Sequence, residues 1–208
     1  MRSGCELCCE TPGRITRNLR ETLPYHGKVN AWTTVIALAL AFVTLAGAQG
    51  GSSQQPKRTP DIYYTPTRHA VADAMLQLAG VTRTDMVYDL GSGDGRIVII
   101  AAQKYGARGV GVEIDPALVA RARQNAEDAG VISLVSFVEG DLFATDLSPA
   151  TVVTLYLSGS VNRLLEPKLK RELHPGARVV SHQFPMPGWT PDATIRPDGI
   201  DVFLWRVQ

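Results

Sequence analysis

Cysteine is nearly absent from this chain of 208 residues, and its three cysteines, Cys5, Cys8 and Cys9, all lie within the first ten positions. Their C-x-x-C-C spacing has no second cysteine pair or histidine cluster that would complete a metal site, so we expect no metal. The rest of the chain needs no disulfide and tolerates an oxidising or a reducing compartment.

An excess of charge is also lacking. The 21 Lys and Arg residues nearly balance the 20 Asp and Glu residues, which leaves a net charge of +1. From Gln49 onward there are 16 basic and 17 acidic residues, a net charge of about −1. A protein with a strongly basic face for nucleic acid would show the opposite balance, so we expect no nucleic-acid partner.

Methionine is missing between Met1 and Met75, whereas residues 31–48 form an apolar run without a charge that ends in Ala46-Gly47-Ala48. An apolar run followed by an A-x-A site is typical of a secretory signal peptide. The polar stretch before it is too long for one, which a true start near Val29 would explain. The alternative is an uncleaved membrane anchor, although 18 residues barely span a bilayer.

Four of the five basic residues before the apolar run favour an orientation with the N-terminus inside: Arg14, Arg17, Arg20 and Lys28. Either alternative therefore predicts an exported, periplasmic protein or a membrane-anchored one. Residues 49–62 have the composition of a linker. We expect an N-terminal extension over 1–48, a linker over 49–62 and one folded domain over 63–208.

The stretch 86–96, MVYDLGSGDGR, is the most informative part of the chain. A short apolar strand ends in Asp89, three alternating glycines follow, and residues 97–102 form an apolar run long enough, with its flanks, for a helix. A strand, a glycine turn and a helix are typical of a nucleotide-binding crossover. A dinucleotide-binding loop would have its third glycine at position 96, which is Arg96. The alternative is a turn in an α/β domain that binds nothing.

The rest of the chain alternates between expected strands and helices. We expect a helix from a Thr67 cap to about Leu78, and a helix that is kinked or split at Pro167. The other strands are expected over 109–114, 134–139, 151–157, 178–184 and 201–207, and the other helix over 116–129. This order predicts an α/β fold with a parallel sheet and right-handed crossovers.

Acids follow the next two strands at positions that suit an adenosine. Glu113 ends the second strand, where a carboxylate accepts both hydroxyl protons of a ribose. Ile114 would pack on the adenine, Asp141 would accept its exocyclic amine, and Leu142 would lie against the ring. The alternatives are a solvated strand-end acid for Glu113 and a capping residue for Asp141.

The sequence carries fewer signals for the second substrate, the acceptor of a transferred group. Tyr156 is expected either to line a methyl-transfer channel or to pack in the core. His182 is either a base or, as we favour, a satisfied histidine at a strand end. The Asn/Asp-Pro-Pro-aromatic element of many nucleobase amino methyltransferases is absent, which argues against a nucleic-acid acceptor.

Four blocks carry a resemblance to a known family: 89–99, 111–119, 151–157 and especially 177–192, ARVVSHQFPMPGWTPD. The acid-x-G-x-G-x-G loop resembles that of class I S-adenosylmethionine (SAM) methyltransferases, in which an acid such as Asp89 suits the ammonium of the methionine moiety. The set of blocks resembles the ATP synthase c-subunit lysine methyltransferases. That resemblance implies a Rossmann-like seven-stranded class I methyltransferase sheet with helices on both faces, SAM as methyl donor and a protein lysine as acceptor. We expect a monomer, and a membrane protein is one candidate substrate.

The resemblance also implies roles for single residues. Tyr64 to Thr67 would lie near the methionine end of SAM, and Phe184 and Trp189 would join Tyr156 in walling the acceptor channel. The residues expected at SAM are Tyr64, Thr67, Asp89, Gly91, Ser92, Gly93, Gly95, Glu113, Ile114, Asp141 and Leu142. The alternative functions are a small-molecule O- or N-methyltransferase and a non-catalytic domain that keeps the fold.

Overall fold

A computed structural model describes residues 63–208, which fold around one mixed β-sheet. Within this part of the chain the sheet has seven strands in the order β3-β2-β1-β4-β5-β7-β6. The strands are β1 (Met86–Leu90), β2 (Arg108–Glu113), β3 (Val135–Glu139), β4 (Val152–Leu155), β5 (Arg178–His182), β6 (Ala193–Ile195) and β7 (Val202–Arg206). The helices are α2 (His69–Leu78), α3 (Arg96–Tyr105), α4 (Pro116–Asp128), α5 (Gly159–Glu172) and the 3₁₀ turn η1 (Pro197–Gly199).

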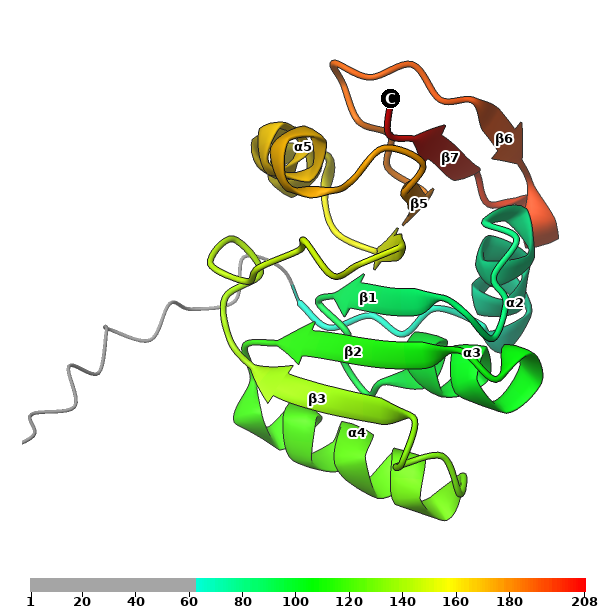
Figure 1. Cartoon of the computed structure of the whole chain (residues 1–208), viewed down its shortest axis with the longest axis vertical. Helices are drawn as coiled ribbons and strands as arrows, with labels where there is room; N and C mark the ends of the chain where they lie inside the picture. The colour runs from blue at the N-terminus through cyan, green and yellow to red at the C-terminus, as the bar shows by residue number, and fades with distance from the viewer. Residues whose placement is uncertain (1–62) are drawn as a thin grey trace, which may run out of the picture. The chain divides into compact units, whose positions relative to one another are not determined.

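Strands β1 to β5 pair in parallel, β7 pairs antiparallel with β5, and β6 pairs antiparallel with β7. The predicted seven-stranded α/β sheet is therefore confirmed. Figure 1 shows α2 and α5 on opposite sides of the sheet. One apolar core packs α2, α3 and α4 against one face of the sheet, and a second core packs α5 and the loop after β3 against the other.

Three local expectations differ from the structure. Thr67 does not cap α2, because Arg68 occupies the cap position and makes no side-chain cap bond. The helix α5 is not split at Pro167, which lies exposed within its 14 residues. Strand β5 stops at His182, since Gln183 has a φ of 69° that no regular strand accepts.

The strand β6 was not expected from the sequence. It has three residues, none of them fully buried, and it lies in a Pro- and Gly-rich segment. Its register is set by pairing with β7, from Ala193 opposite Leu204 to Ile195 opposite Val202. A short edge strand of this kind has no alternating apolar pattern to predict it.

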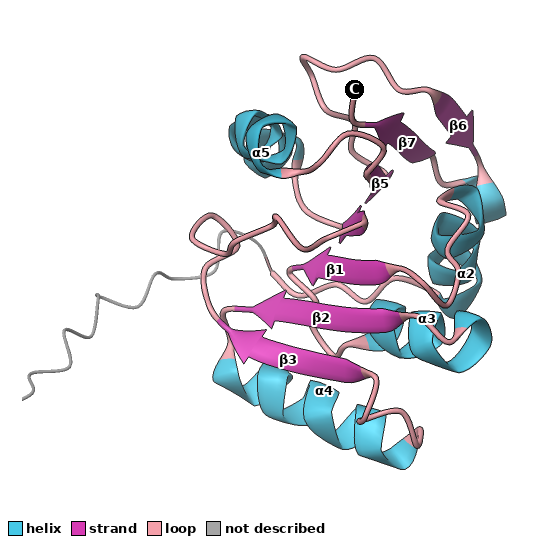
Figure 2. Ribbon diagram, in the orientation of Figure 1, coloured by secondary structure: helices cyan, strands magenta, loops and turns pink. Residues whose placement is uncertain are grey.

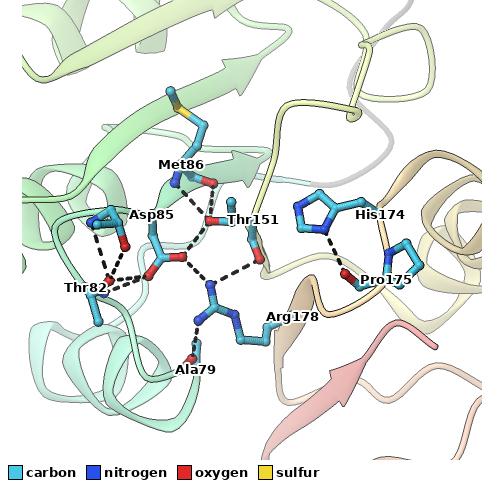
Figure 3. Close-up of polar contacts among 9 residues, drawn as sticks. Ala79, Thr82, Asp85, Met86, Thr151, His174, Pro175 and Arg178 are labelled. Carbon is cyan, nitrogen blue, oxygen red and sulfur yellow. Dashed lines mark hydrogen bonds and ion pairs between the residues drawn. The ribbon is translucent and has the colours of Figure 1, made fainter.

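A polar network joins the amino ends of β1, β4 and β5 (Figure 3). The Asp85 carboxylate accepts hydrogen bonds from the Thr151 hydroxyl at 2.7 Å and the Thr82 backbone N–H at 2.8 Å, and it forms an ion pair with Arg178. Burial raises the pKa of Asp85, but the bonds from Thr151, Thr82 and Arg178 outweigh it, so the pKa lies below its usual value. Arg178, part of the 177–192 block, therefore fixes the sheet at the edge away from the strand carboxyl ends.

Candidate active site

A cavity of about 620 Å³ lies at the carboxyl ends of the parallel strands. The arrowheads of β1, β2 and β3 in Figure 2 point to this edge of the sheet. Open α/β sheets bind their ligands there, and the volume is that of a small-molecule site. The lining comes from residues before α2, the glycine turn, the ends of β2 and β3, and the start of α5: Tyr63 to Thr67, Asp89, Gly91, Ser92, Asp94, Arg96, Ile97, Val112 to Asp115, Leu118, Gly140 to Leu142, Tyr156, Leu157 and Val161.

The three glycines of the turn are required by conformation and by space. Gly91, Gly93 and Gly95 have φ angles of 78°, 55° and 80°. A Cβ on Gly93 would come within 2.3 Å of the Tyr64 ring, and a Cβ on Gly95 within 2.5 Å of Phe137. Gly93 and Gly95 do not line the cavity themselves. They shape the turn that does.

Glu113 holds this turn in place. Its carboxylate accepts hydrogen bonds from the backbone N–H groups of Gly93 at 2.9 Å, Ile114 at 2.8 Å and Asp115 at 3.0 Å. An ionised carboxylate has about four acceptor positions, so three are already used within the protein. The predicted ribose contact therefore has about one position left, and Glu113 both shapes the loop and lines the cavity.

Asp89 lies at the floor of the cavity, and its side chain is almost completely buried. Burial raises the pKa of the Asp89 carboxyl to about 7, against the opposing effect of a 2.7 Å hydrogen bond from the Thr154 hydroxyl. The negative charges of Glu113 and Asp94 add to the rise. A cation placed beside Asp89 would offset this cost, which fits a ligand with an ammonium group.

Residues 63–67, which we call the strap, cross the cavity and are held by Arg96. The Arg96 guanidinium donates to both oxygens of Asp94 at 2.9 and 2.6 Å, to the Thr67 carbonyl at 2.7 Å and to the Tyr64 hydroxyl at 3.4 Å. Sequence reasoning noted Arg96 only as a missing glycine and overlooked Asp94. The signal available was the D-G-R order at the helix start, where an acid and a base two residues apart can pair.

The adenine-side residues also line the cavity. Asp141 accepts a bond from the Phe143 backbone N–H at 2.9 Å, so it caps the turn after β3 as well as facing the site. Ile114 and Leu142 add apolar surface. The Ser92 hydroxyl is buried with no hydrogen-bond partner among residues 63–208. This hydroxyl lies on the side of β2, where a Cβ on Gly111 would come within 2.7 Å of it.

The expected acceptor-side residues do not all meet at the cavity. Tyr156 lines it, whereas Phe184 and Trp189 do not. The Phe184 carbonyl accepts a bond from Asn162 at 2.8 Å, and the Trp189 carbonyl accepts one from the Trp205 indole at 2.8 Å. These two bonds fasten the segment to α5 and β7. We expected this part of the block 177–192 to wall a channel, whereas its backbone is bonded to neighbouring elements of the fold.

Together, the glycine turn, the acids at the carboxyl ends of β1 and β2, the acid after β3 and the sheet order define a class I SAM-dependent methyltransferase. A crystal structure described as an RNA methyltransferase from Salinibacter ruber, in complex with S-adenosyl-L-homocysteine, is 58% identical and superposes with a TM-score of 0.68 over 69% of this chain and 94% of that one. The demethylated donor in that structure supports SAM as the methyl donor of this chain.

The chain belongs to the ANTKMT methyltransferase domain family, which matches residues 89–193. A Saccharolobus islandicus protein-lysine N-methyltransferase is 47% identical over 138 residues, 66% of this chain and 86% of the relative. The mouse ATP synthase c-subunit lysine N-methyltransferase is 36% identical over 175 residues, 84% of this chain and 65% of the relative. The resemblance that the sequence carried is thereby confirmed.

The expected location does not stand. The prediction of an exported or membrane-anchored protein is wrong. The finding that overturns it is the Saccharolobus relative, because a match of 138 residues covers 86% of its length, and 138 is fewer than the residues of the folded domain. Among residues 63–208 no helix is long and apolar enough to cross a bilayer. Residues 1–62, with the apolar run 31–48, the cysteines and the linker, lie outside the described residues.

Proposed function

We propose that this methyltransferase transfers the methyl group of SAM to the side-chain amine of a protein lysine. The observation that carries the proposal is the 47% identity to a protein-lysine N-methyltransferase across 86% of that relative's length. Two further features of the described residues support it: the acid-lined floor of the cavity and the charge of the domain.

The donor would be held by the residues that line the cavity between the strap and β3. Asp89 suits its ammonium, and Glu113 and Asp141 offer acceptors to the adenosine. SAM supplies a methyl carbon on a sulfonium, so as the lysine N–C bond forms, the C–S bond breaks and its electron pair goes to sulfur. The protein has to align the two groups and exclude water.

The acceptor amine must enter as the free base, because its lone pair forms the new bond. The proton that the amine gives up goes to solvent, and no buried acid or base of the site is required to take it. Tyr156 is the aromatic side chain that the cavity presents beyond the strap and the glycine turn. We assign it to the wall along which the lysine side chain lies.

RNA methylation is a second candidate, favoured by the description of the Salinibacter structure. The charge of residues 63–208 opposes it. This part of the chain has 14 Lys and Arg residues against 16 Asp and Glu residues, a net charge of −2. Proteins that bind RNA derive much of their affinity from Lys and Arg contacts to phosphate.

Labelled SAM distinguishes the two candidates. The full chain is incubated with SAM carrying a labelled methyl group and with an extract that contains both protein and RNA. The proposal predicts label that protease releases and ribonuclease does not, and that appears as methyllysine after acid hydrolysis. Label that ribonuclease releases would establish the RNA candidate instead.

A further inference from the structure

His182 is the last residue of β5, and it is 3% exposed. Its ring lies against the Tyr156 ring, with centroids 3.8 Å apart and planes tilted by 30°. Its Nδ1 atom is 3.2 Å from the Thr67 hydroxyl. Both neighbours line the cavity, Thr67 from the strap and Tyr156 from the segment after β4.

Thr67 links this histidine to the cofactor side. Its hydroxyl contacts His182, while its carbonyl accepts a 2.7 Å bond from Arg96 at the start of α3. Thr67 is 4% exposed, so both contacts are shielded from water. A continuous chain of contacts therefore runs from the glycine turn through Arg96 and Thr67 to His182 and Tyr156.

The chemistry of the imidazole suits a wall that a cation approaches. Burial lowers the pKa of His182 to about 4, and the positive charge of Arg68 contributes, so the ring is neutral near pH 7. Its Nε2 atom is buried without a partner among residues 63–208. An unpaired buried nitrogen is destabilising, and an apolar ring of similar size would avoid that cost.

We propose that His182 is a positioning residue for methyl transfer, which fixes the Tyr156 ring and the Thr67 hydroxyl so that the acceptor amine meets the methyl group in line. The inference rests on the proposed function, since it concerns the acceptor half of the same site. His182 acts through its two neighbours and touches neither reacting atom. Because misplacement by about 1 Å can cost about 100-fold in rate, loss of this support should lower kcat.

The test compares four variants of the full chain by kcat, by KM for SAM and by thermal unfolding. His182→Ala removes both contacts, His182→Phe keeps a ring against Tyr156, and Thr67→Val keeps volume but removes the hydroxyl. His174→Ala is the matched control, because His174 is exposed and its ring contacts the carbonyl of the neighbouring Pro175, away from the cavity. We expect kcat to fall at least about 10-fold in His182→Ala and less in His182→Phe and Thr67→Val. KM for SAM should stay within about threefold in both His182 variants and in His174→Ala.

The inference is overturned if His182→Ala keeps the wild-type kcat, or if KM for SAM rises in step with the loss of kcat. Should His182→Ala fail to fold, the two volume-conserving variants decide, and wild-type kcat in both overturns it. If the wild-type enzyme labels another acceptor in place of lysine, the proposed function is refuted, but the inference about His182 is not. The four variants are then compared on that acceptor, with the same expected order.

Discussion

The Glu113 carboxylate accepts a hydrogen bond from the Gly93 backbone N–H at 2.9 Å, so the end of β2 holds the turn that follows β1. The same carboxylate accepts two more backbone bonds, from Ile114 and Asp115. The acid expected to bind a ribose is therefore also the acid that shapes the glycine turn. This double role makes its substitution more damaging than the loss of a ligand contact.

Replacement of Glu113 by glutamine should weaken SAM binding as strongly as replacement by alanine. A glutamine side chain places an N–H donor where a carboxylate oxygen now accepts from a backbone N–H, so at least one donor is left unpaired. An unpaired buried donor costs about 1–3 kcal/mol, which corresponds to roughly 5-fold to 150-fold in the dissociation constant. Titration calorimetry measures this, with Glu127→Gln on the exposed face of α4 as the control. Wild-type affinity in Glu113→Gln would refute the role.

Gly93→Ala should disturb the strap. Its new Cβ would lie 2.3 Å from the Tyr64 ring, and the φ of 55° costs a non-glycine residue about 1–2 kcal/mol. We expect loss of SAM affinity, partly restored in the double variant Gly93→Ala, Tyr64→Ala, because the second change removes the clash and leaves the backbone cost. No restoration would show that the ring and the glycine do not compete for the same space.

SAM affinity should depend on pH through Asp89. The carboxyl has a pKa of about 7 in the protein without ligand, and the ammonium of the donor favours the ionised form. Affinity should therefore fall about 10-fold between pH 8 and pH 6, with proton release on binding near pH 6. Asp89→Asn should bind SAM weakly and with little pH dependence over this range. Binding measured in two buffers of different ionisation enthalpy reports the released proton.

The Asp89 carboxyl makes SAM affinity rise with pH, but it makes the stability of the fold fall with pH. Its folded-state pKa lies above the usual value of 3.8, so folding takes up a proton between about pH 4 and pH 7. The contribution of Asp89 to stability is present below about pH 4 and lost as the pH rises through about 7. Asp89→Asn should therefore unfold at a higher temperature than the wild type at pH 8 and show a smaller difference at pH 5.

The polar network of Figure 3 should affect the stability of the fold but not the binding of SAM. Arg178→Ala leaves the buried Asp85 carboxylate without its ion-pair partner, which costs about 3 kcal/mol for a pair of this kind. In a domain of this size that lowers the unfolding temperature by roughly 6–12 °C. SAM affinity at 20 °C should stay at the wild-type value, since Arg178 does not line the cavity. A large loss of affinity in a folded variant would contradict this division.

Much of the fold followed from local patterns in the sequence. The Asp89 to Gly95 spacing and the apolar strands are short-range signals. The start of α4 is local too, because Asp115 caps it by accepting from the Ala117 N–H at 2.8 Å. Those signals report chain conformation and burial, which is why they predicted the sheet.

Side-chain partners far apart in sequence were not predictable in the same way. The bonds from Arg96 to the strap, from Asn162 to Phe184 and between Thr67 and His182 depend on how separate elements pack. Phe184 and Trp189 were placed at the acceptor by resemblance, yet their carbonyls fasten a loop to α5 and β7. Nothing in the residue types of that block separates a channel wall from a packing element.

The central claim is that the methyl group of SAM ends on a lysine side chain. Its most direct test is tandem mass spectrometry of the acceptor protein after reaction of the full chain with SAM carrying a deuterated methyl group, with Asp89→Asn run in parallel. We predict a mass increase on the lysine side-chain nitrogen that depends on the wild-type enzyme and is much reduced in the variant. Deuterated methyl found in RNA or in a small molecule, with none on lysine, would contradict the account.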